Sequence, residues 1–450
     1  MQNPAAPASS GRADLEIGKL IDTASLGGTH WRIALLALAA IVLDGYDLQI
    51  LGFAAPALMQ EWGITRADLA PIFAAGMVGV AIGGLLVGPQ GDVWGRKRAI
   101  ILSVIFFGLT TLACAYATSP AGLLVLRLLA GIGLGGALTN ATALVVETAP
   151  MRWRSLLTMA TMVGVPVGGV IGGEVSARLI PAQGWESVFV VGGVVPLALA
   201  VALALWMPES ARFLLRANRP GAEVARAVNA LIGEERFRPE DPLWLEEPAA
   251  RKASFKDLFG TTLRRDTLGV WTIFLTNLFG MFCFLNWLPT VLASLGHDLA
   301  TSSRMLGAYN LGGIAGTVLA AWLIGYIGSR RVLAGVAAGG VLAALLMGQA
   351  DLSLPATALA LCVFSGICLN AMQVGAYLLS AHVYPTTVRA TGVGSAVAVG
   401  RIGALASSFA GAIVGTGAGG ASLLFGIVAF SMLLVLGGVM LVRNHVPAHH

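Results

Sequence analysis

The sequence predicts an all-α membrane protein with twelve transmembrane helices in two pseudo-symmetric bundles of six. Hydrophobic residues make up 56% of the 450 residues and charged residues only 11%, whereas a soluble chain has about 25% charged residues. The apolar residues gather in segments long enough to cross a hydrocarbon core about 30 Å thick. These segments form two sets of six on either side of one polar stretch.

The polar stretch and the chain ends divide the sequence into five parts. The predicted parts are a tail at 1–30, a bundle at 31–207, a linker at 208–266, a bundle at 267–443 and a tail at 444–450. Each predicted span is long enough to form a helix across the bilayer. The spans are 33–58, 68–90, 99–117, 121–146, 156–180, 186–207, 268–293, 304–327, 332–350, 355–381, 390–414 and 420–442.

The Lys and Arg residues predict the orientation, because they are enriched in cytoplasmic loops. Of the 28 Lys and Arg residues, only Arg66, Arg178 and Arg304 fall in or beside outer loops, and Arg127 and Arg401 lie within spans. The others are on the inner side if both termini are cytoplasmic, so we expect that orientation. The linker interleaves its basic residues with acids, a pattern that predicts amphipathic helices on the inner membrane face.

The two halves match each other, as in transporters built from repeats. Matched positions are Pro56 with Pro289, Gly95 with Gly328, and Pro150 and Arg154 with Pro385 and Arg389. At nearly the same offsets Asp44 matches Asn277, and Glu147 matches His382. The ionisable groups therefore differ between the halves. We hypothesise that one half mainly handles a proton and the other mainly shapes a substrate pocket.

The first span holds two carboxylates in the run Asp44-Gly-Tyr-Asp47. An ionised group at the middle of a bilayer costs about 2.5–3.5 kcal/mol, so such residues usually face a cavity and handle ions, protons or substrate. Their i, i+3 spacing places both on roughly one helix face, and Gly45 lets another helix or a ligand approach the backbone. The alternative is a single Asp that hydrogen-bonds to neighbouring helices for packing alone.

Several other classes of chemistry lack their sequence signatures. The four cysteines, Cys114, Cys283, Cys362 and Cys368, sit in apolar segments without metal-ligand spacing. We see no glycine-rich phosphate loop with its lysine and no nucleophile with a matching base. The first thirty residues have no apolar core of a cleavable signal peptide. We therefore predict no enzyme activity, no cofactor, no metal and no nucleic-acid partner.

The loop Gly88-Pro-Gln-Gly91-Asp92-Val-Trp-Gly95-Arg96-Lys97-Arg98 makes the chain recognisable. It resembles the signature between the second and third helices of major facilitator transporters, and Arg127-x-x-x-Gly131-x-Gly133 matches a second pattern of that family. The resemblance implies the major facilitator fold, whose two bundles open alternately to either side. It also implies that Asp92 pairs with the basic cluster in a latch. The predicted gating residues are Gly88, Asp92, Gly95, Arg96, Lys97, Arg154 and Arg389.

A narrower resemblance, to the aromatic acid:proton symporters, covers nearly the whole membrane part. It rests on the Asp44-Gly-Tyr-Asp47 run, on Glu147-x-x-Pro150 and Trp287-Leu-Pro289-Thr, and on Tyr384-Pro-x-x-x-Arg389-Ala-Thr-Gly392 leading to Gly400-Arg401-Ile-Gly403. That resemblance implies proton-coupled uptake of benzoate-type or hydroxybenzoate-type carboxylates across the bacterial inner membrane. One departure is Gly325, where the family usually has an acidic residue.

The proton-coupling candidates are Asp44, Asp47 and Glu147. Two carboxylates that interact titrate as a pair, and the two aspartates share one stretch of helix. Glu147 is placed near the inner end of its span. It could relay a proton or pair with Arg152 or Arg154, and the sequence favours neither.

The substrate-binding candidates are two cations and four polar or aromatic residues. An aromatic carboxylate needs a cation in a low-dielectric cavity, and a guanidinium can bind it bidentately. Arg127 and Arg401 are the arginines within spans, although Arg127 could instead form a structural pair with an acid. Aromatic rings need flat apolar walls. The remaining candidates are Tyr46, Trp287, Asn277 and His382. A lone histidine such as His382 is more often structural.

The expected partners are therefore a small aromatic carboxylate, a proton and the lipid bilayer, and we expect a monomer. The alternative function is transport of another organic acid, a sugar or a drug. A sugar site would offer several Gln and Asn side chains. A membrane sensor would bind a ligand without accumulating it. Glu174 and Arg178, four residues apart near the outer surface, are expected to form an ordinary ion pair.

Overall fold

The computed structural model describes residues 15–246, 255–415 and 417–448. In this part of the chain twelve spans, one of them formed by two consecutive helices, are long and apolar enough to cross a membrane, which confirms the predicted fold class. The first set comprises α3 (Gly28–Trp62), α4 (Arg66–Leu86), α6 (Arg96–Cys114), α7 (Pro120–Thr148), α8 (Met151–Met162) joined to α9 (Gly164–Gln183), and α10 (Glu186–Trp206). The second comprises α13 (Arg264–Ser294), α14 (Leu299–Ile327), α15 (Ser329–Gln349), α16 (Pro355–Val383), α17 (Arg389–Ile413) and α18 (Gly417–Leu441).

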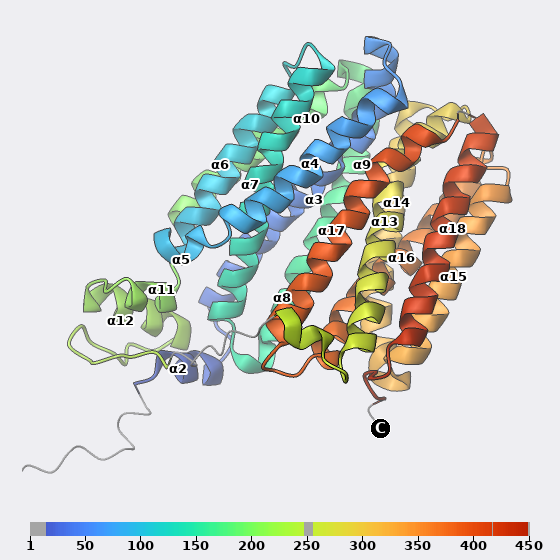
Figure 1. Cartoon of the computed structure of the whole chain (residues 1–450). Helices are drawn as coiled ribbons and strands as arrows, with labels where there is room; N and C mark the ends of the chain where they lie inside the picture. Colours follow the sequence, from blue (N-terminus) through green and yellow to red (C-terminus); the bar gives the residue numbers. More distant parts are fainter. Residues whose placement is uncertain (1–14, 247–254, 416, 449–450) are drawn as a thin grey trace, which may run out of the picture.

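The short elements gather at one end of the bundle, which we call the linker end. They are α2 (Ile17–Thr23), α5 (Gln90–Trp94), α11 (Ala211–Arg216), α12 (Gly221–Ile232) and the 3-10 helix η1 (Phe255–Phe259). Figure 1 shows α2, α11 and α12 together at this end, and the chain also leaves α18 there. The predicted amphipathic linker helices are present as α11 and α12, whereas linker residues 247–254 lie outside the described part.

The predicted N-terminal tail is partly structured, because α2 binds the linker. The backbone N–H of Ile17 donates to the carbonyl of Trp244 at 2.9 Å, and the N–H of Trp244 donates to Leu15 at 3.1 Å. Ile17 and Ile21 are fully buried beside the apolar face of α12. The tail and the linker thus form one packed unit beneath the first half.

Glycines with left-handed backbone mark equivalent turns in the two halves. Gly95 precedes α6 with φ of 98°, and Gly328 precedes α15 with φ of 80°. Side chains rarely adopt such angles, so glycine is required at both turns. The repeat inferred from the sequence is therefore also present in the backbone geometry.

Close packing of helices depends on glycine at Gly45 as well. A Cβ atom there would overlap the backbone of Val165 in α9, and one at Gly168 would overlap the carbonyl of Val42 in α3. This pair of small residues lets α3 and α9 touch along their backbones. The predicted close approach at Gly45 is thus made by a helix of the same half.

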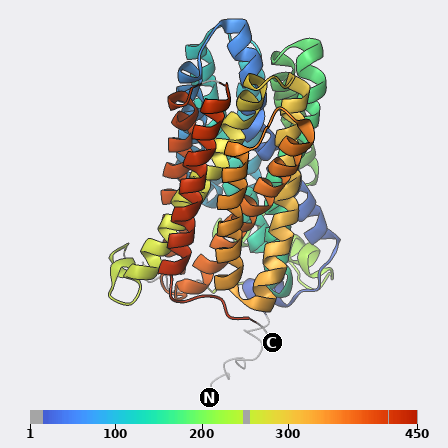
Figure 2. The same ribbon diagram turned by 90° about the vertical axis from the view of Figure 1, so that its right-hand side faces the viewer.

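The two halves meet along α9 with α14, α4 with α17, and α3 with α13. Figures 1 and 2 show the long helices running side by side, with the first half in blue to green and the second in yellow to red. Gly52 of α3 lies against the backbone of Leu285 in α13, and Gly173 of α9 lies against Gly307 of α14. These contacts bring the two halves together along α3 and α9.

Candidate functional site

Asp47 and Arg127 form a buried ion pair inside the first half. The Nη2 atom of Arg127 donates to Oδ2 of Asp47 and to its backbone carbonyl, both at 3.0 Å, and Nη1 donates to Oδ1 at 3.2 Å. Thr111 also donates to Oδ1 at 2.6 Å. The two charged side chains are 1% and 5% exposed, so each is closed off by the other. This arrangement is the structural pair that the sequence left open for Arg127, whereas substrate binding by Arg127 and proton coupling by Asp47 stay predictions.

Tyr46 is a packing residue in this structure. Its hydroxyl donates to the carbonyl of Val188 in α10 at 2.9 Å, and its ring packs against Gly172 and Gly192. The side chain is only 4% exposed. The ring therefore ties α3 to α9 and α10, and its contact with substrate stays a prediction.

Asp44 differs from Asp47 in having no paired cation. It is buried, and among the described residues no side chain or backbone group donates a hydrogen bond to its carboxylate. Its charged neighbours are Asp47, on the same helix, and Arg401 from α17 of the other half. Ionisable residues within membrane spans mark proton relays and substrate paths, so Asp44 stays a candidate for proton coupling.

Arg401 reaches from the second half toward the first. A Cβ atom at Gly84 of α4 would lie 3.8 Å from its Nη1 atom. The side chain is partly exposed, and within the described ranges it has neither a hydrogen bond nor an ion pair. Arg401 is thus a cation that faces the interface between the halves and can bind an anion.

Polar side chains of α13 and α16 lie beside Arg401. Asn277 donates to Gln373 at 2.9 Å. Gln373 lies one helical turn before Tyr377 in α16, and Arg401 is the charged neighbour of the Tyr377 hydroxyl. The ring of Tyr377 packs edge-on against Phe274, with centroids 5.1 Å apart. We call Asp44, Arg401, Asn277, Gln373 and Tyr377 the central site. It combines an acid, a cation, amides and an aromatic ring contributed by both halves.

Trp287 and His382 lie elsewhere. Trp287 is fully buried, donates to the carbonyl of Ser407 at 3.0 Å and packs against Phe73 of the first half. His382 is exposed in the last turn of α16. The structure does not bring either residue to the central site, so their assignment to substrate binding is not supported by this conformation.

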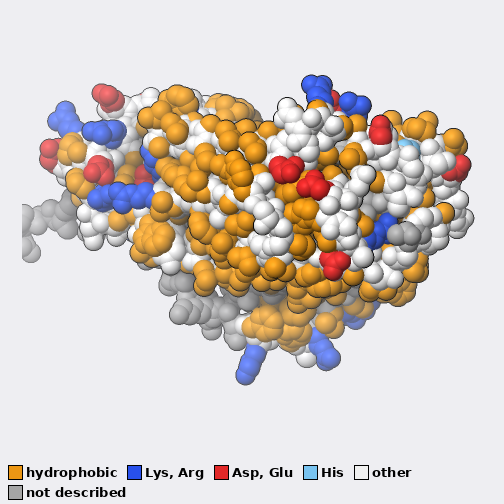
Figure 3. Space-filling view, turned by 90° about the horizontal axis from the view of Figure 1, so that it is seen from above, with side chains coloured by type: hydrophobic (Ala, Val, Ile, Leu, Met, Phe, Trp, Pro, Cys, Tyr) orange, Lys and Arg blue, Asp and Glu red, His pale blue; other side chains and the backbone are white. Residues whose placement is uncertain are grey.

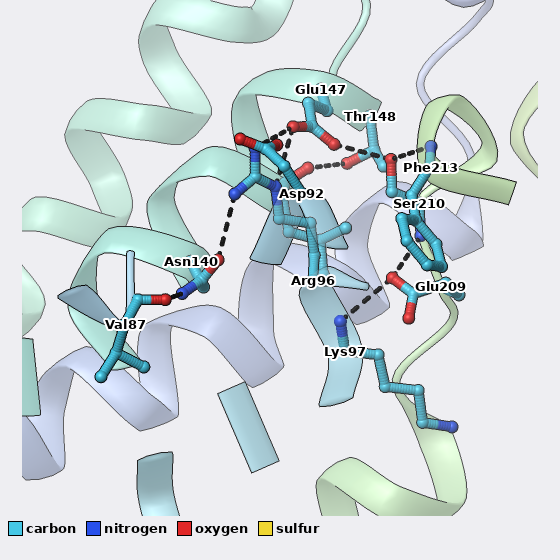
Figure 4. Close-up of polar contacts among 11 residues, drawn as sticks. Val87, Asp92, Arg96, Lys97, Asn140, Glu147, Thr148, Glu209, Ser210 and Phe213 are labelled. Carbon is cyan, nitrogen blue, oxygen red and sulfur yellow. Dashed lines mark hydrogen bonds and ion pairs between the residues drawn. The ribbon is translucent and has the colours of Figure 1, made fainter. Parts of the chain in front are cut away.

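The predicted latch is present at the linker end, and Figure 4 shows its contacts. Arg96 pairs with Asp92 at 2.5 Å and with Glu147 at 2.9 Å, and it donates to Asn140 at 3.1 Å. Ser210 donates to the second carboxylate oxygen of Glu147 at 2.6 Å. Glu147 was expected to pair with Arg152 or Arg154 or to relay a proton. Its actual partners correct the first expectation and place it in the latch instead.

Three residues of this network were not predicted. Asn140 and Glu209 bond to the predicted gating loop, and Ser210 bonds to Glu147. The backbone N–H of Lys97 donates to Glu209 at 3.0 Å. Burial raises the pKa of Glu209 above its ordinary value, although the N–H groups of Lys97 and Ser210 favour its charged form.

The glycines of the loop fit tightly into this network. A Cβ at Gly95 would overlap Glu209 and Phe213, and one at Gly88 would overlap the carbonyl of Gly84. The linker therefore closes directly onto the gating loop. A side chain at Gly95 would push the linker away from the gating loop, and one at Gly88 would push the loop away from Gly84.

Two predicted gating arginines lie outside this network. Arg154 forms an ion pair with Asp22 of α2 and donates to the carbonyl of Ala149 at 3.1 Å. Arg389 donates to the carbonyl of Tyr384 at 3.2 Å. Arg154 therefore connects α8 to the N-terminal helix, and Arg389 stabilises the turn before α17.

In the second half, Gly325 stands at the position that corresponds to Asp92, so the charged latch has no counterpart there. Side-chain atoms added at Gly325 would meet open space. The chain after α18 occupies the neighbouring turn instead. The N–H of Ser329 donates to Val446 at 3.0 Å, and the N–H of Val446 donates to the Ser329 hydroxyl at 2.9 Å. Neutral hydrogen bonds are thus formed at this turn, in line with the departure at Gly325, where the family usually has an acidic residue.

The halves are bonded to each other at the centre and at the end opposite the linker. Asn310 donates to Gln49 at 2.7 Å, and both amides are buried. Arg304 donates to Glu174 at 3.2 Å, and Glu174 also forms the predicted ion pair with Arg178. Arg66 donates to Ser294 and to the carbonyl of Gly415, at 3.2 and 3.1 Å.

Among the described residues, the hydrogen bonds that join the helices of the two halves all lie at the centre or at the end opposite the linker. Acidic side chains lie near the middle of the opposite face, seen from above in Figure 3. The molecule is therefore held closed at that opposite end.

Twelve spans in two matched sets, a charged gating loop and an intramembrane acid and cation define a class of membrane transporter. Residues 37–407 match the Major Facilitator Superfamily, and the chain belongs to that superfamily. This confirms the broader family resemblance, and it makes the protein a transporter rather than an enzyme.

Relatives with aromatic substrates in their names align over most of the chain. The gallate transporter of Pseudomonas putida is 37% identical, over 94% of this chain and 95% of that protein. The 4-hydroxybenzoate transporter PcaK of Acinetobacter baylyi is 36% identical, over 90% and 89%.

Among solved structures, a D-xylose-proton symporter aligns with a TM-score of 0.71 at 17% identity, over 93% of this chain and 98% of that one. The inward-open xylose transporter XylE from E. coli gives 0.70 at 16% identity, over 90% and 95%. These low identities support the shared fold alone.

Proposed function

We propose that the protein is a secondary active transporter that takes up an aromatic carboxylate, such as 4-hydroxybenzoate or benzoate, together with protons. The observation that carries this proposal is that Asp44 and Arg401, one from each half, are unpaired charged neighbours. They approach each other from the two halves, and neither is bonded to another described residue. The names of the relatives, which include gallate, 4-hydroxybenzoate and benzoate transporters, support the aromatic substrate.

Charge couples the two substrates in this proposal. The carboxylate of the substrate binds the Arg401 guanidinium, and its ring packs against Tyr377 and Phe274. The charge of Asp44 repels a second anion nearby, and protonation of Asp44 removes that repulsion. Each ligand therefore increases the affinity for the other, as reciprocal linkage requires.

Alternating access in this proposal exchanges two sets of contacts. Opening the end opposite the linker breaks the bonds made by Arg66, Gln49 and Glu174 across the halves. The Arg96 network holds the first half and the linker together while the other end is open. Asp92, Arg96, Lys97 and Glu147 are then gating residues, with Asn140, Glu209 and Ser210 as further members.

We also propose that the linker end faces the cytoplasm of a bacterial cell and that the protein works as a monomer in the inner membrane. The excess of Lys and Arg at this end supports the orientation. Both termini are then cytoplasmic, and transport moves substrate inward. A cycle with one proton and one monoanion would be electroneutral, so a current driven by voltage would require at least two protons.

Uptake of labelled acids into vesicles, with and without an imposed pH gradient, tests this function. We expect 4-hydroxybenzoate or benzoate to accumulate above its outside concentration only when the gradient is present. Glucose is the matched non-aromatic probe. Accumulation of glucose without accumulation of either aromatic acid would contradict the proposal.

A further inference from the structure

Asn277 and Gln373 form a chain of oriented amides in the second half. The carbonyl of Leu369 can only accept a hydrogen bond, so the Nδ2 atom of Asn277 must face it, at 3.3 Å. The same nitrogen donates to Oε1 of Gln373 at 2.9 Å. This contact uses the carbonyl oxygen of Gln373 and leaves its amide nitrogen for the next neighbour.

The next neighbour is the hydroxyl group of Tyr377, which lies one helical turn along α16 from Gln373 and interacts with it. An amide nitrogen on this side can only donate to the hydroxyl oxygen, which leaves the hydroxyl proton free to be donated to another group. Tyr377 is 43% exposed, so packing does not seal it off. Its ring is held edge-on against Phe274, which limits the directions that the hydroxyl can take.

Arg401 is the charged group beside this hydroxyl. A carboxylate held by a guanidinium still has lone pairs that can accept a further hydrogen bond. Hydrogen bonds to a charged acceptor are roughly twice as strong as those between neutral groups. An oriented neutral donor next to Arg401 therefore complements a bound carboxylate without adding charge.

We propose that Tyr377 donates its hydroxyl proton in a hydrogen bond to the carboxylate of the substrate at Arg401, and that Gln373 and Asn277 are positioning residues that aim this donor. The inference rests on the proposed function and adds the second element of the carboxylate site. It also gives a basis for selecting carboxylates over the corresponding amides, because an amide presents N–H donors to a site built of donors.

The test measures KM and Vmax for 4-hydroxybenzoate uptake by full-length protein in proteoliposomes with an imposed pH gradient. Tyr377→Phe keeps the ring contact with Phe274 and removes the donor, and Gln373→Met removes the amide at similar volume. Loss of a hydrogen bond to a charged group predicts a KM about tenfold higher for either variant, with Vmax within about twofold of wild type. Tyr326→Phe, on a side chain that is 62% exposed next to Trp322, is the matched control and should not change KM.

The double variant separates positioning from a purely structural role. If Gln373 acts through the Tyr377 hydroxyl, Tyr377→Phe combined with Gln373→Met should raise KM no further than either change alone. Competition by 4-hydroxybenzamide, negligible in wild type, should become measurable relative to the carboxylate in Tyr377→Phe. Melting temperature without substrate verifies folding, and Gln373→Leu replaces Gln373→Met if the latter is unstable.

An unchanged KM in folded Tyr377→Phe would overturn the inference, as would additive effects in the double variant. Either result would leave the proposed function standing as long as wild type accumulates the acid. Failure of wild type to accumulate any aromatic carboxylate would instead overturn the proposed function itself.

Discussion

The guanidinium of Arg127 and the carboxylate of Asp47 lie 3.0 Å apart and neutralise each other inside the first half. The other acid of the same helical run, Asp44, and the other arginine within a span, Arg401, have no such partner in the described chain. This difference separates a structural ion pair, Asp47 and Arg127, from the two charged residues that we propose for transport, Asp44 and Arg401.

Breaking the Asp47–Arg127 pair should destabilise the protein. Arg127→Ala leaves the carboxylate of Asp47 buried without its cation, and removal of one partner of a buried pair costs about 3–5 kcal/mol. We expect a strong fall in melting temperature in detergent and poor expression. Restoring neutrality with Asp47→Asn in the same chain should recover part of the loss. A single variant as stable as wild type would contradict the structural role.

Arg401→Gln should have the opposite profile. The side chain is partly exposed and unpaired, so the melting temperature should stay near the wild-type value. Loss of a bidentate charged contact with the substrate should weaken binding about a hundredfold, as expected for two hydrogen bonds to a charged group. Binding of 4-hydroxybenzoate by calorimetry measures the effect. Wild-type affinity in this variant would remove Arg401 from the site.

The amide bond between Asn310 and Gln49 should help to keep the end opposite the linker closed. Asn310→Ala removes one of the contacts between the halves, so the population open at that end should increase. Distances between spin labels at Gln60 of α3 and Thr301 of α14 report that opening. Asn370→Ala, which removes an amide that bonds within its own helix, is the control. An unchanged distance distribution in Asn310→Ala would show that this bond does not gate.

Glu209, at the linker end, should make the stability of the folded protein depend on pH. Its pKa is raised above the ordinary value of 4.5, chiefly by burial. The folded protein therefore binds this proton more tightly than the unfolded chain does, and stability from this group rises as the pH falls from about 7 toward 4.5. The melting temperature of wild type relative to Glu209→Gln should rise over that range. The exposed Glu223→Gln serves as control, and a constant or falling difference for Glu209→Gln would contradict the buried setting.

The fold was largely predictable from sequence, because a bilayer requires long apolar segments and their boundaries are marked by charged loops. The repeat was visible as well, since the turns at Gly95 and Gly328 both need a glycine with positive φ. The pairing of Asp92 with Arg96 was also correctly predicted, whereas the role of this loop in gating stays a prediction.

The pairing of charges within the membrane was not predictable. Asp47 and Arg127 are 80 residues apart, and hydropathy does not say which helices are neighbours or which face of each is shared. From the sequence, Arg127 could either bind substrate or form a structural pair with an acid. The ion pair with Asp47 becomes visible only when α3 is packed against α7. Glu209 and Ser210 were missed for the same reason, because nothing in the linker sequence shows that it folds back on the gating loop.

Uptake by Asp44→Asn compared with wild type tests the central claim most directly. The measurement is accumulation of labelled 4-hydroxybenzoate in vesicles under an imposed pH gradient, alongside exchange of labelled for unlabelled acid without a gradient. The account predicts that the variant is folded and exchanges substrate but no longer accumulates it. Gradient-driven accumulation at the wild-type level in Asp44→Asn would show that this carboxylate does not carry the coupled proton.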